Sequence, residues 1–148
     1  MPVVVTGGAE NDTFIVSPRQ STAISGGGGN DTFLIKGSTP GVPVNLNGDG
    51  GDDTFTFPAM PPTGAIVNVD GGPHSAGDTM TVTSAIATLS DNGVRIAGSG
   101  VGEVFYANIE RKSVIGVPSP VPSTDPWALL AITLGVLAFA SRSRRRAA

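Results

Sequence analysis

Short stretches in which hydrophobic and polar residues alternate recur in pairs along the first 83 residues of the chain. An alternation with a period of two places successive side chains on opposite faces of a β-strand. The stretches on either side of each glycine-rich turn are Val3–Thr6 and Thr13–Val16, Thr22–Ser25 and Thr32–Ile35, Val44–Asn47 and Thr54–Phe57, and Val67–Asp70 and Thr79–Val82. Their apolar faces hold equivalent residues: Val5, Ile24, Leu46 and Val69 before the turns, and Phe14, Phe33, Phe55 and Met80, then Val16, Ile35, Phe57 and Val82, after them. The pattern predicts strands that stack into one core.

The turn between paired stretches is a glycine run that ends in a carboxylate, a threonine and an apolar residue. It occurs as Gly7–Phe14, Gly26–Phe33 and Gly48–Phe55, and again, interrupted by an insertion, as Asp70–Met80. The turn carboxylates lie 19, 22 and 25 residues apart at Asp12, Asp31, Asp53 and Asp78. A coil of two nonapeptides needs about 18 residues. The turns therefore recur once per coil and are expected to stack on one edge, about 4.8 Å apart.

The sequence thus predicts an all-β fold, a parallel β-roll or β-helix solenoid of about four coils over residues 1–83. Residues 84–115 are expected to form a β cap over the last coil. This cap should contain a hairpin, because Asp91-Asn92-Gly93 supplies the positive φ angles of a type I′ turn. Residues 116–126 form a proline-rich linker, and residues 127–148 a separate tail.

Composition narrows the possible functions. The 148 residues include 21 glycines and 12 prolines, and the regular placement of the glycines favours a solenoid over a disordered chain. With no cysteine, the chain has no disulfide and no thiolate metal site. Residues 1–117 hold eleven acidic and five basic side chains, which argues against nucleic acid as a partner. No Ser/His/Asp arrangement indicates catalysis, so we expect a protein that is not an enzyme.

The glycine-rich turns have the composition of a site for a hard cation. Glycine lets the backbone turn its carbonyl groups towards one point, and the aspartate adds negative charge there. Calcium takes six to eight oxygen ligands, which two stacked turns can supply together. Alternatively, these turns are ordinary solenoid corners with solvated acids, which would make a metal-free structural solenoid. The only histidine, His74, is expected to be an exposed loop residue rather than a ligand.

On these residues, the segment 3–82 resembles the RTX (hemolysin-type) calcium-binding repeat family, a parallel β-roll that holds ions between neighbouring turns. The resemblance implies Ca²⁺ ligands at the sixth position of each turn, a polar residue at the fifth, and glycines that shape the backbone. The corresponding residues are Asp12, Asp31, Asp53 and Asp78; Asn11, Asn30 and Asp52; and Gly8, Gly27, Gly29 and Gly51. Glu10 and Asp49 replace glycines of the family pattern, and Asp49 is included among the candidate ligands. The best site is expected between the second and third turns, and the weakest at the fourth.

The C-terminal tail has the layout of a membrane anchor. Trp127–Ala140 is a run of 14 apolar or small residues, followed by the basic residues Arg142, Arg144, Arg145 and Arg146. Tryptophan at one end and arginines at the other are typical of interfacial and cytoplasmic anchors, which predicts a short transmembrane helix. With Val121–Leu130, this layout resembles the IPTL-CTERM and PEP-CTERM sorting signals, which implies processing by an exosortase-type protease. An ordinary tail anchor is the alternative.

These features together predict a module of a bacterial cell-surface or secreted protein, which serves as a calcium-stabilised spacer or adhesive scaffold. Sorting of this kind requires export, yet the residues from Met1 onwards resemble no signal peptide. We therefore expect the chain to be a C-terminal fragment of a larger protein. One alternative remains open beside the metal-free solenoid: the calcium-binding tail of a secreted hydrolase whose catalytic domain is absent.

Overall fold

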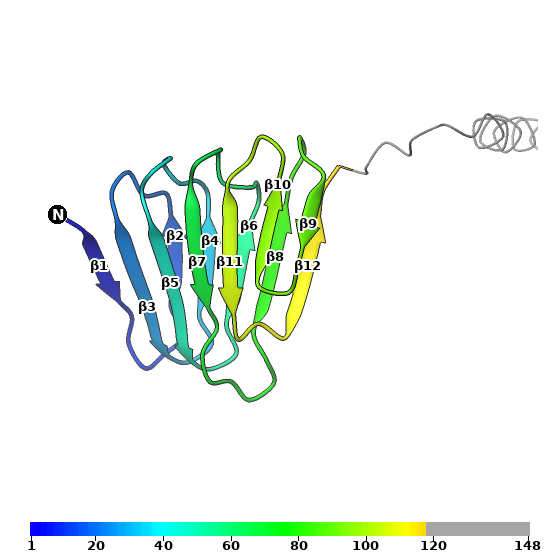
Figure 1. Cartoon of the computed structure of the whole chain (residues 1–148). Helices are drawn as coiled ribbons and strands as arrows, with labels where there is room; N and C mark the ends of the chain where they lie inside the picture. Colours follow the sequence, from blue (N-terminus) through cyan, green and yellow to red (C-terminus); the bar gives the residue numbers. More distant parts are fainter. Residues whose placement is uncertain (118–148) are drawn as a thin grey trace, which may run out of the picture. The chain divides into compact units, whose positions relative to one another are not determined.

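The computed structural model describes residues 1–117, and all regular elements in this part of the chain are β-strands (Figure 1). None of these residues belongs to a helix long and apolar enough to cross a membrane. The predicted transmembrane helix and the linker beyond residue 117 lie outside the described residues, as do the predicted anchor residues Trp127, Arg142, Arg144, Arg145 and Arg146.

The strands form two sheets, and odd- and even-numbered strands alternate between them up to β8. One sheet has the order β1–β3–β5–β7–β11–β10–β9, and the other β12–β8–β6–β4–β2. The strands of the first are β1 (Val3–Thr6), β3 (Thr22–Gly28), β5 (Val44–Gly50), β7 (Ile66–Asp70), β11 (Glu103–Ala107), β10 (Arg95–Gly98) and β9 (Leu89–Asp91). Those of the second are β2 (Thr13–Val16), β4 (Thr32–Ile35), β6 (Thr54–Phe57), β8 (Thr79–Thr83) and β12 (Arg111–Ile115). The predicted all-β parallel solenoid is confirmed.

The core lies between the two sheets and consists of the residues that the alternation placed on the apolar face. The strand register puts Phe14 beside Phe33, Phe33 beside Phe55, and Phe55 beside Met80. The ring of Phe33 stacks on the ring of Phe14, with centroids 4.9 Å apart, and on the ring of Phe55, with centroids 4.6 Å apart. From the second coil onward these ladder residues are buried, whereas Val5 at the open first coil is 39% exposed.

The segment expected to be the cap divides into two parts with different roles. β11 and β12 pair in parallel with β7 and β8, so they add a fifth level to the solenoid rather than covering it. Only β9 and β10 form the antiparallel hairpin, which joins the sheet beside β11. The expected type I′ turn is wrong: Gly93 has a φ of +93°, but Asn92 does not adopt a positive φ. Asn92 instead receives two hydrogen bonds on its side chain, from the backbone N–H groups of Val94 and Arg95.

Polar side chains end the core at the fifth level. Lys112 is paired in register with Met80, and its Nζ lies 4.3 Å from the ring centroid of Tyr106 and 2.6 Å from the hydroxyl oxygen of that residue. The Tyr106 hydroxyl also donates a hydrogen bond to Asp91, whose carboxylate lies 3.5 Å from Lys112 Nζ. Tyr106, Lys112 and Asp91 therefore satisfy one another's hydrogen-bonding groups at the end of the apolar ladder.

Replacing Phe33 by alanine should destabilise the solenoid much more than the same change at Phe14. Phe33 is fully buried between two rings, and a Phe→Ala change at such a site costs about 3–5 kcal/mol. Phe14 is half-buried at the open end with one stacked neighbour, so its loss should cost less than half as much. Urea denaturation of both variants measures the difference, and equal losses would show that the first coil packs as tightly as the second.

Candidate metal-binding turns

The carboxylates at the sixth position of the turns form a row of hydrogen bonds inside the solenoid edge. Asp31 Oδ1 accepts the backbone N–H of Asp12, Asp53 Oδ1 accepts that of Asp31, and Asp78 Oδ1 accepts that of Asp53, each at 2.7 Å. Asp31, Asp53 and Asp78 are at most 1% exposed. Three of the four predicted sixth-position residues are therefore buried side by side, and we call Asp31, Asp53 and Asp78 the inner row.

The fifth-position residues form a second row that runs in the opposite direction. Asn11 Oδ1 accepts the backbone N–H of Asn30 at 2.7 Å, and Asn30 Oδ1 accepts that of Asp52 at 2.9 Å. In the inner row a side chain binds the coil before it, whereas here it binds the coil after it. These side chains are exposed or half-buried. The asparagines Asn11 and Asn30 thus connect successive turns by hydrogen bonds that need no metal.

Asp52 ends this outer row by holding the insertion in the fourth turn. Its Oδ1 accepts the backbone N–H groups of Ser75, Ala76 and Gly77 at 2.9, 2.6 and 3.0 Å, and its Oδ2 accepts the Ser75 hydroxyl at 3.0 Å. The hydrogen bonds from Gly77 and Ala76 are the main reason that the pKa of Asp52 lies well below its ordinary value. Asp52, which the sequence predicted as a calcium ligand, therefore anchors the loop of the fourth turn.

The second oxygen of each inner-row carboxylate faces other oxygens. Within residues 1–117, Oδ2 of Asp31, Asp53 and Asp78 is buried and has no hydrogen-bond partner. A Cβ atom placed on Gly26 would lie 2.1 Å from Asp31 Oδ2 and 2.6 Å from the carbonyl oxygen of Gly48. The same arrangement recurs at Gly48, with Asp53 Oδ2 at 2.1 Å and the Gly71 carbonyl oxygen at 2.4 Å.

Two acceptor oxygens thus converge beside the first glycine of each turn, and no donor lies between them among the described residues. Burying such an oxygen without a partner is costly, and a proton or a cation between the two oxygens would remove the cost. The arrangement also explains why the first position is glycine, since any side chain there would overlap the carboxylate. At Gly71 the converging atoms are Asp78 Oδ2 and the carbonyl oxygen of Asn108, 2.3 and 2.0 Å from the Cβ position.

Burial and mutual repulsion disfavour the charged form of the inner row. Burial raises the pKa of Asp53 to about 6, and the neighbouring charges of Asp78, Asp31 and Asp49 add to the effect. The pKa values of Asp31 and Asp78 are also raised, in both cases mainly by burial. A row of carboxylates with raised pKa values is a candidate functional site, because a bound cation would stabilise their charged form.

The remaining predicted residues occupy different positions around these turns. Asp12, in the open first coil, is half-buried and accepts the Gly8 N–H at 2.7 Å. Gly27 and Gly29 have a φ of +104°, and Gly51 one of +139°, a region that glycine adopts at little cost. Asp49 pairs in register with Gly27 and has a φ of +65°. Gly27, Gly29 and Gly51 bring the turns of neighbouring coils close together and have no side chain to bind a metal.

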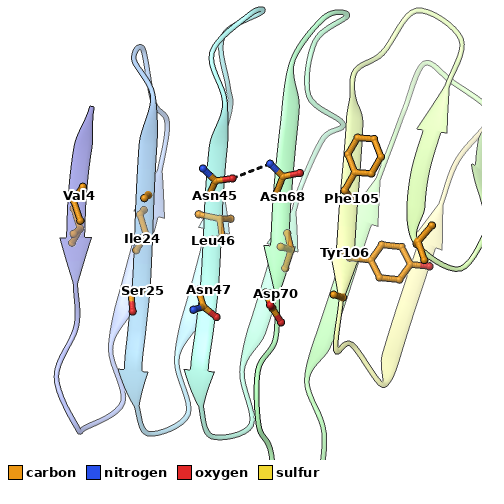
Figure 2. A pocket seen from close by; sticks show the side chains of 15 residues that line it. Val4, Ile24, Ser25, Asn45, Leu46, Asn47, Asn68, Asp70, Phe105 and Tyr106 are labelled. Atoms are coloured by element: carbon orange, nitrogen blue, oxygen red, sulfur yellow. Dashed lines mark hydrogen bonds between the residues drawn. The ribbon is translucent and has the colours of Figure 1, made fainter. Parts of the chain in front are cut away.

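Asp49 points to the outer face of the seven-stranded sheet. Its carboxylate accepts hydrogen bonds from the Ser25 hydroxyl and from the Asn47 amide, and both of these residues precede the first glycine of their turn. Figure 2 shows Ser25, Asn47 and Asp70 in one row across β3, β5 and β7. This face is hollowed into a shallow pocket. Asp49 therefore lies outside the inner row, although its charge still raises the pKa values of Asp31 and Asp53.

Sequence reasoning missed two residues at the end of the inner row. Glu110 Oε2 accepts the backbone N–H of Asp78 at 2.8 Å, so this glutamate takes the place of an aspartate at the fifth level. Asn108, with a φ of +51°, adopts the left-handed conformation that glycines supply in the earlier turns. His74 Nδ1 lies 3.6 Å from Asp78 Oδ2 and 3.4 Å from Glu110 Oε2. The available signal was an acidic residue directly before a strand, as at Asp31 and Asp53, but without the glycines of the repeat.

Comparisons with protein-family models, with curated proteins and with solved structures find no match to the chain.

The metal-free protein should lose stability as the pH rises from about 4 to about 6. Folding raises the pKa of Asp53 from an ordinary 3.8 to about 6, so the folded state favours the protonated carboxyl. The contribution to stability is full below the lower value and is lost as the pH passes the higher one. The lowered pKa of Asp52 has the opposite effect on stability, but only below pH 3.8, the ordinary pKa of an aspartate. Melting temperatures in the presence of a chelator measure this slope.

Asp53→Asn is the matched control for this pH dependence. The amide keeps an oxygen for the Asp31 N–H but does not titrate, so the fall in melting temperature between pH 4 and 6 should become smaller. A wild-type melting temperature that is constant or rises over this range would contradict the assignment of a raised pKa to the inner row.

Proposed function

We propose that residues 1–117 form a calcium-stabilised structural module. The observation that carries this proposal is the inner row, in which buried carboxylate oxygens face backbone carbonyl oxygens with no donor between them. Calcium binds carboxylate and carbonyl oxygens in flexible geometries, with six to eight ligands in all. Carboxylates that repel each other in every coil also favour a divalent ion over a monovalent one, because a single Ca²⁺ offsets two negative charges.

The strongest site is proposed between the second and third turns. Asp31 and Asp53 are both buried there, and the glycines of both turns bring carbonyl oxygens close to the carboxylates. The first turn is weaker in this scheme, since Asp12 is only half-buried and its Oδ2 already accepts the Gly8 N–H. The ligands proposed for calcium are accordingly Asp31 and Asp53, with backbone carbonyls of the two turns.

We further propose that the module acts as a spacer or adhesive scaffold of a bacterial cell-surface or secreted protein. Regular stacking of coils in two sheets is suited to a rigid spacer, because each coil is supported by its neighbours. The tail sequence, which resembles a sorting signal, supports attachment to a membrane and processing by an exosortase-type protease. No catalytic role is proposed for the chain.

A metal-free structural solenoid is the second candidate, and the two rows of hydrogen bonds favour it. Oδ1 of each inner-row carboxylate and the fifth-position asparagines connect the coils without any ion. A proton on each Oδ2, donated to the facing carbonyl, would then satisfy the pair of oxygens. The raised pKa of Asp53 is compatible with this arrangement at mildly acidic pH.

The substitution Asp53→Asn separates the two candidates. If calcium binds the inner row, 5 mM Ca²⁺ should raise the melting temperature of the wild-type full chain well above its value in chelator, because the ion binds only the folded state. The variant should lose most of that increase. In chelator it should be at least as stable as the wild type, since its amide can donate to the Gly71 carbonyl oxygen. Circular dichroism melting curves provide the measurement.

Glu103→Gln controls for the change in net charge. Glu103 pairs with Arg95 at 2.6 Å between two partly exposed side chains on β10 and β11, so removing its charge should leave the calcium response unchanged. Equal melting temperatures of the wild type with and without calcium would refute the calcium proposal and leave the metal-free solenoid.

A further inference from the structure

Three side chains with metal-binding atoms converge at the fourth turn, where the inner row ends. His74 Nδ1 lies 3.6 Å from Asp78 Oδ2 and 3.4 Å from Glu110 Oε2, and the three ligand atoms all lie within 4.8 Å of one another. His74 comes from the insertion in the fourth turn, Asp78 from the end of that turn, and Glu110 from the turn between β11 and β12. The cluster therefore joins two successive levels of the solenoid.

Asp78 supplies an independent indication that a ligand belongs here. This residue is fully buried, and its Oδ1 is occupied by the backbone N–H of Asp53. Its Oδ2 is buried without a hydrogen-bond partner within residues 1–117 and is the oxygen that faces His74. A buried carboxylate oxygen in this state needs a positively charged or protonated partner.

The ligand set fits a small tetrahedral ion better than calcium. Zinc binds histidine nitrogen and carboxylate oxygen at about 2.0–2.2 Å, so two ligand atoms of a tetrahedral site lie about 3.3–3.6 Å apart. The two separations measured from His74 Nδ1 match this range. Imidazole nitrogen is a common ligand for zinc, copper, iron and nickel, whereas calcium takes oxygen ligands. His74 and Glu110 are 31% and 36% exposed, which leaves room for a water molecule as the fourth ligand.

The surrounding contacts hold the three ligands in place. Asp52 accepts three backbone N–H groups of the loop that carries His74, and Arg111 donates to the carbonyl oxygen of Ala76 at 2.9 Å in the same loop. The Asp78 N–H binds the ligand oxygen of Glu110 at 2.8 Å. Hydrogen bonds to ligating side chains orient them and strengthen metal binding.

We propose that His74, Asp78 and Glu110 bind one divalent transition-metal ion of the zinc type. The ion cross-links the insertion of the fourth turn to the fifth level, where the glycine-rich turn is replaced by Asn108-Ile109-Glu110. This site is separate from the proposed calcium site at Asp31 and Asp53, because its ligand set contains nitrogen and lies at the other end of the inner row.

An ion pair is the competing arrangement. A protonated His74 imidazole beside Asp78 and Glu110 would satisfy the same distances without metal, and its Nδ1 also lies 3.4 Å from the carbonyl oxygen of Gly72. The experiment must therefore detect metal on the imidazole directly, rather than a change in stability.

The test is titration of the untagged full chain with Co²⁺ and Zn²⁺ at pH 7.5 in 5 mM Ca²⁺. The chain contains one histidine and no cysteine, so histidine ligation can come only from His74. We expect one Co²⁺ per chain with the visible absorption of a tetrahedral site, displaced by one equivalent of Zn²⁺. Excess calcium should not prevent binding, and Asp53→Asn should bind Zn²⁺ as the wild type does.

His74→Ala and Glu110→Gln should each weaken Zn²⁺ binding by at least about tenfold, on the scale of lost metal-site interactions. Glu110→Gln keeps an oxygen for the Asp78 N–H, and circular dichroism verifies that both variants fold. Glu10→Gln, an exposed acid of the first turn, is the matched control and should bind Zn²⁺ normally. Binding that is absent, needs millimolar metal, or is unchanged in His74→Ala would overturn the proposal and leave the ion pair.

Discussion

The fold depends on the hydrogen bond between each inner-row carboxylate and the backbone N–H of the coil before it. This bond fixes the distance between successive turns and holds the aspartate side chain inside the edge of the solenoid. Placing the carboxylate there requires glycine at the first position of the turn, because a Cβ on Gly26 or Gly48 would lie 2.1 Å from the carboxylate oxygen. The aspartate that packs beside the first position therefore requires glycine there.

The opposite directions of the two rows make every coil depend on both of its neighbours. An aspartate of the inner row binds the preceding coil, while Asn11 and Asn30 bind the following one. The hydrophobic ladder alone would tolerate a slip of the strands by two residues, because similar apolar side chains would still meet. The side-chain-to-backbone bonds at the turns allow no such slip. They specify the register, and the stacked rings of Phe14, Phe33 and Phe55 supply the burial that stabilises it.

The first four strand pairs could be predicted from the sequence because each carries both signals, the period of two and the glycine-rich turn. The fifth pair carries only the first signal. There Asn108 adopts the positive φ that glycine has in the earlier turns, and Glu110 accepts a backbone N–H as the aspartates do. This correspondence becomes visible only once β11 lies beside β7. The sequence placed Asp52 and Asp49 in the metal site by position alone. The partners of Asp52 lie in the insertion of the fourth turn, and those of Asp49 lie on the outer face of the sheet.

Each added coil buries one more carboxylate in the same row, so the electrostatic cost of the fold grows with its length. The coil interior cannot neutralise this charge, since Arg19, Lys36, Arg95, Arg111 and Lys112 are the basic residues of the described part and none lies between the inner-row aspartates. Protons relieve the repulsion only at acidic pH, since Asp53 has a pKa of about 6. At neutral pH, the calcium that we propose for this row would offset the repulsion. At its last member, Asp78, the chain places an imidazole beside the free oxygen, so the row ends on a group that can bind a metal or carry a proton itself.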